Sequence, residues 1–405
     1  MLFRSCAERL ARAALTRVAE PGDVALAGLV GRHGAEAVVA GLREGNTFGL
    51  EQARAWQARL AGYDPASDLE AARACGARLV CPGDPEWPSS LDDLAGVLGL
   101  SRRTPSAGHA SDVDGGATAG DSIRNGGVPL ALWARGPAAL ADVCARSVAL
   151  VGSRAATAYG IEVAGDIGYS LASRGVTVVS GAAYGVDGAA HRGALAADAP
   201  TVAVLACGVD VSYPRGHTTL LRRVADDGLV LSEVPPGSAP TRIRFLVRNR
   251  LIAALSRGTV VVEAAVRSGA LNTARWAEQL LRPVLGVPGP VTSAMSAGVH
   301  QLVRDGMACL VTDGDEVLEA VSEMGAHLVP LRTGDTRARD HLDEPTLRVL
   351  EAVPAVHAVG SDRIARTAGL PLHEVEVKLG RLLLQDFVEQ CGQRWRLSPS
   401  ARDRT

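Results

Sequence analysis

Five arginines lie in a stretch of this 405-residue chain that contains no acidic side chain. The stretch runs from 235 to 262, and its arginines are Arg242, Arg244, Arg248, Arg250 and Arg257. Guanidinium groups bind phosphates through paired hydrogen bonds, and Phe245 adds a ring on which a base can stack. A run of charge is usually a solvated helix face, but the length of this acid-free window favours a phosphate-binding surface. Arg248 and Arg250 flank Asn249, where we expect a helix to start.

Small polar residues and further arginines follow other short apolar runs. These groups are Gly152-Ser153-Arg154 after 148–151, Ser180-Gly181 after 176–179, Arg215 after 202–206, and Arg267-Ser268-Gly269 after 260–262. In a parallel sheet, such groups lie in the loops at the carboxyl ends of the strands, where ligands bind. A glycine there lets backbone N–H groups approach an anion. We therefore expect these residues and the arginine window to line one groove.

Signatures of common active sites are missing from these loops. The run after Val151 lacks the G-x-G-x-x-G fingerprint of dinucleotide enzymes, which argues against the hypothesis of a nicotinamide-dependent oxidoreductase. Asp187 and His191 lie four residues apart, and we interpret Asp187 as a helix cap with His191 as its partner. A nucleotide hydrolase of the phosphoribohydrolase type, with Glu263 as its carboxylate, stays the alternative, although its Pro-Gly-Gly-x-Gly-Thr loop is absent.

Strands and helices alternate after Ser147. Apolar runs predict strands at 176–180, 201–206, 228–231, 259–263 and 284–287, and helical patterns predict helices at 161–174, 189–196, 217–225, 249–255 and 273–281. The predicted fold is α/β, an extended Rossmann-like parallel sheet with an N-terminal helical module of SAM or helix-hairpin type and a C-terminal winged helix. The expected parts are 1–75 for the helical module, 76–324 for the sheet domain, 325–342 for a linker and 343–398 for the winged helix. We expect 101–127, rich in Gly and Ser, to be a disordered insertion.

The composition is that of a globular protein with a formal net charge of −2, so a nucleic-acid site must be a local patch. Seven scattered cysteines without a C-x-x-C pair predict reduced thiols and no zinc site. The early charges at the N-terminus and the lack of a long apolar run predict a cytoplasmic protein that does not enter the membrane. We expect no metal and no cofactor.

A series of motifs, in order along the chain, resembles the DprA/Smf family of DNA-processing proteins. The motifs lie at 148–154, 180–191, 203–214, 231–237, 245–252 and 261–274, followed by Pro288-Gly289 and 300–306. The resemblance implies a non-enzymatic protein that binds and protects incoming single-stranded DNA in natural transformation, loads the RecA recombinase and forms a homodimer. Two positions depart from the family pattern: Tyr184 replaces a basic residue, and Leu246 replaces a proline.

The residue patterns and the resemblance together predict where DNA binds. The predicted DNA-binding residues are Gly152, Ser153, Arg154, Ser180, Gly181, Arg215, Arg242, Arg244, Arg248, Asn249, Arg250, Arg267, Ser268 and Gly269. The candidate recognition helix of the winged helix, 372–388, carries acidic and basic side chains together. That mixture predicts a protein contact rather than duplex binding.

Overall fold

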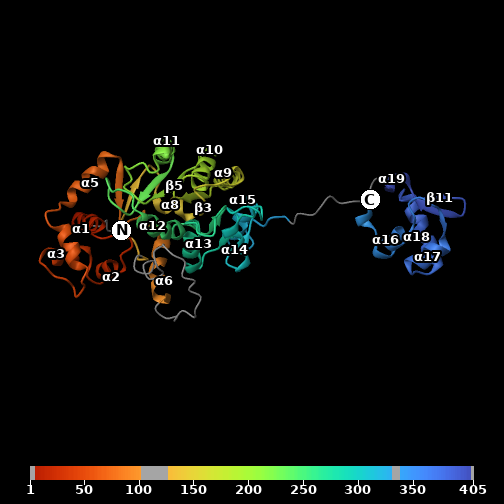
Figure 1. Cartoon of the computed structure of the whole chain (residues 1–405), viewed down its shortest axis with the longest axis horizontal. Helices are drawn as coiled ribbons and strands as arrows, with labels where there is room; N and C mark the ends of the chain where they lie inside the picture. The colour runs from red at the N-terminus through yellow and green to blue at the C-terminus, as the bar shows by residue number, and fades with distance from the viewer. Residues whose placement is uncertain (1–4, 102–125, 331–337, 403–405) are drawn as a thin grey trace. The chain divides into compact units, whose positions relative to one another are not determined.

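The computed structural model of the chain describes residues 5–101, 126–330 and 338–402. The chain forms two compact units, Met1–Val329 and Pro330–Thr405 (Figure 1). Each unit has its own hydrophobic core. The residues of the predicted groove all belong to the first unit, so the fold of that unit determines their geometry.

A nine-stranded sheet forms the centre of the first unit, in the order β1-β2-β6-β5-β4-β3-β7-β8-β9. The parallel strands in the described chain are β3 (Ser147–Val151), β4 (Thr177–Ser180), β5 (Thr201–Leu205), β6 (Leu229–Ser232), β7 (Thr259–Val261), β8 (Val284–Gly286) and β9 (Cys309–Leu310). The antiparallel strands β1 (Ala77–Val80) and β2 (Leu132–Arg135) extend the sheet beyond β6. Strands covered on both faces need apolar side chains on both, which is why they are continuous apolar runs in the sequence. The α/β prediction is confirmed.

Helices cover both faces of the sheet (Figure 1). One face carries α9 (Ala158–Ser173), α10 (Val186–Ala196), η2 (Arg215–His217), α11 (Thr218–Asp227) and α15 (Gly314–Val321). The other carries α8 (Leu140–Ala145), α12 (Arg242–Ala254), α13 (Ala270–Gln279) and α14 (Ala297–Arg304). Alternate residues of β3 contribute to the two cores, Leu150 to the first and Ala149 to the second. The sheet is therefore a rigid layer whose carboxyl edge supports the loops.

The strand order reverses at β3, which lies between β4 and β7. At such a switch point the chains leaving the two neighbouring strands cross to opposite faces, and ligands of α/β proteins bind beside it. The loops after β3 and β7 are joined here, because the Ser153 N–H donates to the Glu263 carbonyl oxygen at 2.7 Å. The switch point is thus formed by Gly152, Ser153 and Arg154 on one side and the loop after β7 on the other.

The arginine window forms a longer helix than the sequence prediction gave. We expected a helix from Asn249, but α12 already begins at Arg242. Thr241 is its N-cap, and its hydroxyl oxygen accepts the N–H of Arg244 at 3.4 Å. A threonine cap followed by a segment without glycine or proline favours this earlier start. Asn249 and the arginines beside it therefore lie in the middle of a helix, where neighbouring side chains point in different directions.

Five helices precede β1, namely α1 (Cys6–Val18), α2 (Val24–His33), α3 (Ala35–Arg43), α4 (Ala53–Leu60) and α5 (Pro65–Ala74). They pack around a core that includes Leu15, Leu26 and Trp56. Arg17 pairs with Asp68 and also donates to the carbonyl oxygen of Pro236 at 3.1 Å, which links these helices to the sheet domain. After β1 come η1 (Ser89–Leu91) and α6 (Asp93–Ser101). Most of the predicted insertion, 102–125, lies outside the described residues.

The second unit combines helices with a small antiparallel sheet of order β10-β12-β11. Its elements are η3 (Ala338–His341), α16 (Glu344–Ala352), β10 (Val359–Gly360), α17 (Ser361–Ala368), α18 (Leu372–Leu384), β11 (Val388–Cys391), β12 (Arg394–Leu397) and α19 (Pro399–Arg402). The hairpin turns at Gly392, whose φ of 65° is a left-handed conformation that glycine adopts readily. The helix predicted at 372–388 ends earlier, because Asp386 also has a positive φ, 59°. Across the described residues, no helix has the length and apolar character needed to cross a membrane.

Candidate nucleic-acid interface

Helix α12 contacts the loops that follow four of the parallel strands. Its Phe245 lies against Arg154 from the loop after β3 and against Tyr213 from the loop after β5. Its Arg248 donates to the carbonyl oxygen of Gly181, directly after β4, and its Asn249 donates to that of Gly269, after β7. The structure thus brings the separate sequence motifs together on one helix. We call Arg154, Tyr213, Phe245 and Arg248 the α12 rim.

Aromatic rings and an arginine stack at the outside of this rim. The guanidinium carbon of Arg154 lies 4.9 Å from the centroid of the Phe245 ring, a cation–π distance. The rings of Phe245 and Tyr213 lie 5.4 Å apart at 47°. Arg154 and Tyr213 are exposed and Phe245 is half-buried. An exposed cation beside two rings can hold a phosphate and stack a base at the same time.

Tyr184, which departs from the family pattern, lies next to the rim. Its ring meets His217 edge-on at 4.9 Å, and its hydroxyl oxygen accepts the Gly216 N–H at 3.2 Å. The side chain is 48% exposed, so the ring presents a free face to solvent. An exposed aromatic face stacks on any base, so Tyr184 offers a further stacking surface.

Arg248 is the buried member of the α12 rim and is only 6% exposed. It donates to the carbonyl oxygens of Gly181, at 2.9 Å, and Val204. Burial lowers the pKa of Arg248 to about 10, and nearby Asp187 opposes this shift. Burial also raises the pKa of Asp187, against the effect of Arg248 and of backbone N–H groups. The Arg248 guanidinium is thus held 5.9 Å from the centroid of the Phe245 ring, with the Asp187 carboxylate offsetting part of its charge. A Cβ on Gly181 would lie 2.5 Å from the guanidinium, so this position requires glycine.

Two other predicted arginines point away from the rim. Arg250 is fully buried, and one of its nitrogens binds both oxygens of Glu233, at 2.7 and 2.8 Å. This burial corrects the expectation that Arg250 contacts DNA, because a strand cannot reach it. Arg244 forms an ion pair with Glu20 of the N-terminal helices at 2.9 Å. Residues 248 and 250 are two apart on a helix, about 200° around its axis, so the two side chains point to opposite sides.

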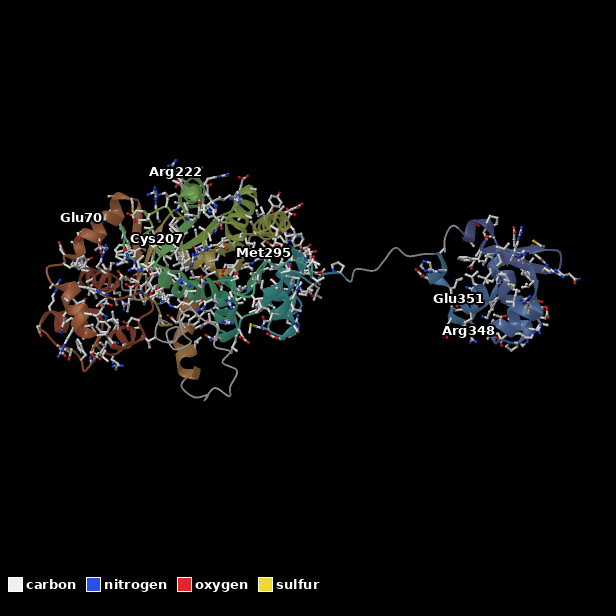
Figure 2. The ribbon with its side chains drawn as sticks, viewed as in Figure 1. Glu70, Cys207, Arg222, Met295, Arg348 and Glu351 are labelled. Atoms are coloured by element: carbon white, nitrogen blue, oxygen red, sulfur yellow. The ribbon has the colours of Figure 1, made fainter. Side chains whose placement is uncertain are left out.

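The remaining predicted residues divide between structural and exposed positions. Ser180 is fully buried and donates to the Leu150 carbonyl oxygen at 2.6 Å, so its predicted contact with DNA is also corrected. Ser153 donates to Sδ of Met295 at 3.4 Å (Met295 is labelled in Figure 2). Ser268 accepts the N–H of Ala270 and so starts α13. Arg215, Arg242 and Arg267 are exposed, as is the backbone at Gly269, whereas Gly152 is half-buried.

The anion position at the start of α9 is filled by the chain's own carboxylate. Glu263 is 1% exposed, and its oxygens accept the backbone N–H of Thr157 at 2.8 Å and the Thr157 hydroxyl at 2.6 Å. Gly160 makes room for it, since a Cβ there would lie 2.2 Å from the carboxylate. A nucleotide phosphate would have to displace this group. The arrangement opposes a hydrolase in which Glu263 attacks or activates water at the switch point.

His191 does not pair with Asp187, which corrects our interpretation of the two residues. Its Nδ1 lies 2.8 Å from the Thr201 hydroxyl, and that hydroxyl donates to the Val178 carbonyl oxygen. Nδ1 therefore carries the proton, while Nε2 has no hydrogen-bond partner among the described residues. Asp187 and His191, four residues apart on a helix, could have paired, but the His191 side chain points toward β5 instead. Asp187 accepts the N–H of Ala183 and helps to order the turn before α10.

His191 should make the protein sensitive to mild acid. Burial lowers its pKa to about 3, from an ordinary 6.5. Below pH 6.5 the unfolded chain therefore binds a proton that the folded chain rejects, and stability falls by up to about 1.4 kcal/mol per pH unit from this group. Denaturant unfolding between pH 7 and 4.5 should show a weaker pH dependence for His191→Gln than for the wild type. The exposed His33→Gln is the control, and equal pH slopes for all three proteins would contradict the assignment.

Comparisons with known proteins agree with the motifs. The model of the family described as DNA recombination-mediator protein A matches residues 122–322. The putative DNA processing protein DprA of Mycobacterium tuberculosis is 45% identical over 383 residues, covering 95% of this chain and 92% of that protein. Protein Smf of Escherichia coli is 37% identical over 244 residues, covering 60% and 65%. The X-ray structure of DprA from Streptococcus pneumoniae matches with a TM-score of 0.60 and 26% identity, over 79% of this chain and 100% of that one. The chain therefore belongs to the DprA/Smf family of DNA processing proteins.

Proposed function

We propose that this protein binds single-stranded DNA at the α12 rim without catalysing a reaction on it, protects the strand, and loads the RecA recombinase onto it as a homodimer. The observation that carries the DNA-binding part is the stack of Arg154, Phe245 and Tyr213 at the carboxyl edge of the sheet. Single strands offer both features that this stack recognises, a free base face and a phosphate.

The rim also explains a preference for single strands over duplexes. In a duplex the faces of the bases are covered by their neighbours, so Phe245 and Tyr213 would have nothing to stack against. Arg154 alone would then contribute a phosphate contact that both forms of DNA provide equally. The buried Arg248 guanidinium lies 5.9 Å from the centroid of the ring, and the nearby Asp187 carboxylate offsets part of its charge. The rings therefore determine the preference for single-stranded over duplex DNA, and the charges supply most of the affinity for the strand.

The description of the matching family supports the part of the proposal that concerns recombination, whereas RecA loading and the homodimer are proposed from the resemblance alone. The family model is described as a recombination mediator, and its match covers the segment that contains the rim. A mediator must hold a strand without altering it. The site suits this role because Glu263, the carboxylate at the switch point, is engaged in capping a helix. Protection and loading then follow from the same bound strand, because RecA can nucleate only on DNA that is kept single-stranded and accessible.

Fluorescence anisotropy with labelled oligo-dT and a duplex of equal length tests this function directly. The wild type should prefer the single strand, with a log–log salt slope of about −0.7 for each phosphate contact. Arg154→Ala should weaken binding about tenfold and make the slope shallower by about 0.7, because one phosphate loses its cation. Arg174→Ala, which removes an arginine paired with Asp315 at the far end of α9, is the matched control.

The same samples can test loading. RecA filament formation on the oligonucleotide, measured by its DNA-dependent ATP hydrolysis, should start sooner with the wild type than with Arg154→Ala. Single-strand binding without faster RecA assembly would leave a DNA-protecting protein and remove the loading role. Absence of single-strand binding by the wild type, or release of ribose phosphate from a mononucleotide, would refute the proposal.

A further inference from the structure

A polar cavity separate from the α12 rim lies on the sheet face that carries α11. It has a volume of about 130 Å³ and lies between the end of β2, the loop after β5 and the outer part of α11. Four of its lining residues carry hydrogen-bond donors in their side chains: Arg135, Ser212, Thr218 and Arg222. Apolar side chains, among them Leu205 and Val230, also line it. Arg222 projects from α11 in Figure 2.

Three of these four donor side chains, Arg135, Arg222 and Ser212, have no partner in the described part of the chain. Neither guanidinium forms a hydrogen bond or ion pair there, and neither does the Ser212 hydroxyl. The neighbouring acid, Asp210, directs both of its oxygens to the N–H of Gly237, at 2.8 and 3.0 Å. Arg223, next in sequence on α11, pairs instead with Asp227. Two arginines that line one cavity repel each other, and an anion bound between them would neutralise this repulsion.

The cavity and the α12 rim share the loop between β5 and α11. Ser212 and Thr218 of this loop line the cavity, while Tyr213 between them lies against Phe245 at the rim. The Thr218 hydroxyl donates to the Arg215 carbonyl oxygen at 2.7 Å, which holds the loop closed on itself. Tyr213 at the rim is therefore the direct sequence neighbour of Ser212 at the cavity.

We propose that the cavity is a phosphate subsite, in which Arg135, Arg222 and Ser212 together bind one backbone phosphate of the single strand that leaves the α12 rim. This inference rests on the proposed function and extends it, by assigning the direction of the strand across the 212–218 loop. A planar guanidinium from each side and a hydroxyl match the tetrahedral oxygens of one phosphate better than they match a base edge.

A double-mutant cycle on the full chain tests the subsite. Anisotropy across salt with dT15 should show that Arg135→Gln and Arg222→Ala each weaken binding several-fold and make the salt slope shallower by about 0.7. Because both act on the same phosphate, the double variant should lose little more than either single one. Arg223→Ala, on the same helix and ion-paired, should bind like the wild type. A short dT3, which the rim alone accommodates, should be insensitive to all of these changes.

The other outcomes separate this inference from the function on which it rests. Normal binding by both variants, with Arg154→Ala still weakened, would overturn the subsite and leave the α12 rim intact. Additive losses would point to two independent surface charges and also overturn it. If inorganic phosphate, titrated at constant ionic strength, stabilises the wild type but not Arg222→Ala while dT15 binding is unchanged, the cavity binds free phosphate and not the strand. Failure of the wild type to bind dT15 at all would remove both proposals.

Discussion

Replacing Arg250 with alanine should lower the free energy of unfolding by about 3–5 kcal/mol, the cost of leaving one member of a buried ion pair without its partner. Arg250 has no exposed surface, and the Glu233 side chain is 8% exposed. The same carboxylate also accepts the N–H of Gly22 at 3.0 Å, so it joins α12 to the loop between the first two helices. Loss of Arg250 leaves a buried negative charge with one hydrogen bond to that loop.

Urea unfolding followed by circular dichroism measures this cost. The matched control is Arg244→Ala, on the same helix, whose ion pair with Glu20 is partly exposed and worth at most about 1 kcal/mol. Arg250→Met combined with Glu233→Leu should recover much of the loss, because apolar groups of similar volume remove both charges together. If Arg250→Ala is no more destabilising than Arg244→Ala, the buried pair of Arg250 and Glu233 does not contribute the predicted free energy of unfolding.

The position of Arg250 also changes how DNA-binding experiments should be read. Arg248 and Arg250 are only two positions apart, so a double substitution is an obvious test of DNA binding by the arginine window. In the structure such a variant removes a structural ion pair together with a rim-supporting charge. Any loss of DNA binding would then mix unfolding with a change at the interface. Arg154→Ala avoids this, because its guanidinium is exposed and contacts Phe245 alone among the described rings.

The parallel sheet could be predicted from the sequence because its strands carry a local signal. The runs before Gly152 and before Gly181 are apolar on both faces, and each ends where small polar residues begin. Loops that follow four of these strands contact α12, since the carboxyl ends of parallel strands share an edge. Periodicity and strand order are enough to predict which loops come together at this edge.

The direction in which each arginine points could not be predicted in the same way. Placing the start of the helix at Asn249 rather than Arg242 hid the fact that Arg248 and Arg250 lie on opposite sides of one helix. The partner of Arg250 is Glu233, on the far side of the 234–241 segment, and nothing local marks the two as a pair. Arg135 and Arg222 come from segments almost ninety positions apart, and neither segment carries a sequence motif that marks the two as neighbours. Such juxtapositions depend on tertiary packing, which a single sequence does not encode locally.

Two buried charges, Arg248 of the α12 rim and Asp187, separate its outer residues from the core, so we expect the outer residues to tolerate substitution without loss of the fold. Arg248 and Asp187 oppose each other's pKa shifts and are held by backbone groups of the β4 and β5 ends. They therefore belong to the scaffold. Phe245, Tyr213 and Arg154 lie outside this layer and touch one another mainly through their rings and charge. The ring of Phe245 is the centre of that outer layer.

Phe245→Ala should weaken binding of oligo-dT by about 1–3 kcal/mol, a roughly 5- to 150-fold increase in Kd, with little change in the salt slope. The ring supplies stacking, which is insensitive to salt, and it also positions the Arg154 guanidinium 4.9 Å away. Phe245→Trp should retain most of the affinity, because it keeps an aromatic face. Phe245→Leu keeps apolar volume but no π-face, so it should bind as poorly as the alanine variant.

Tyr169→Ala serves as the control, since it removes a half-exposed ring from α9 at a distance from α12. Thermal unfolding of each variant separates loss of binding from loss of structure. Equal affinity of Phe245→Leu and the wild type would show that the residue only fills space, and the stacking role would pass to Tyr213 or Tyr184. A steep fall in salt slope for Phe245→Ala would mean that the ring acts mainly by holding Arg154, so that the cation, rather than the stacked base, dominates recognition of the strand.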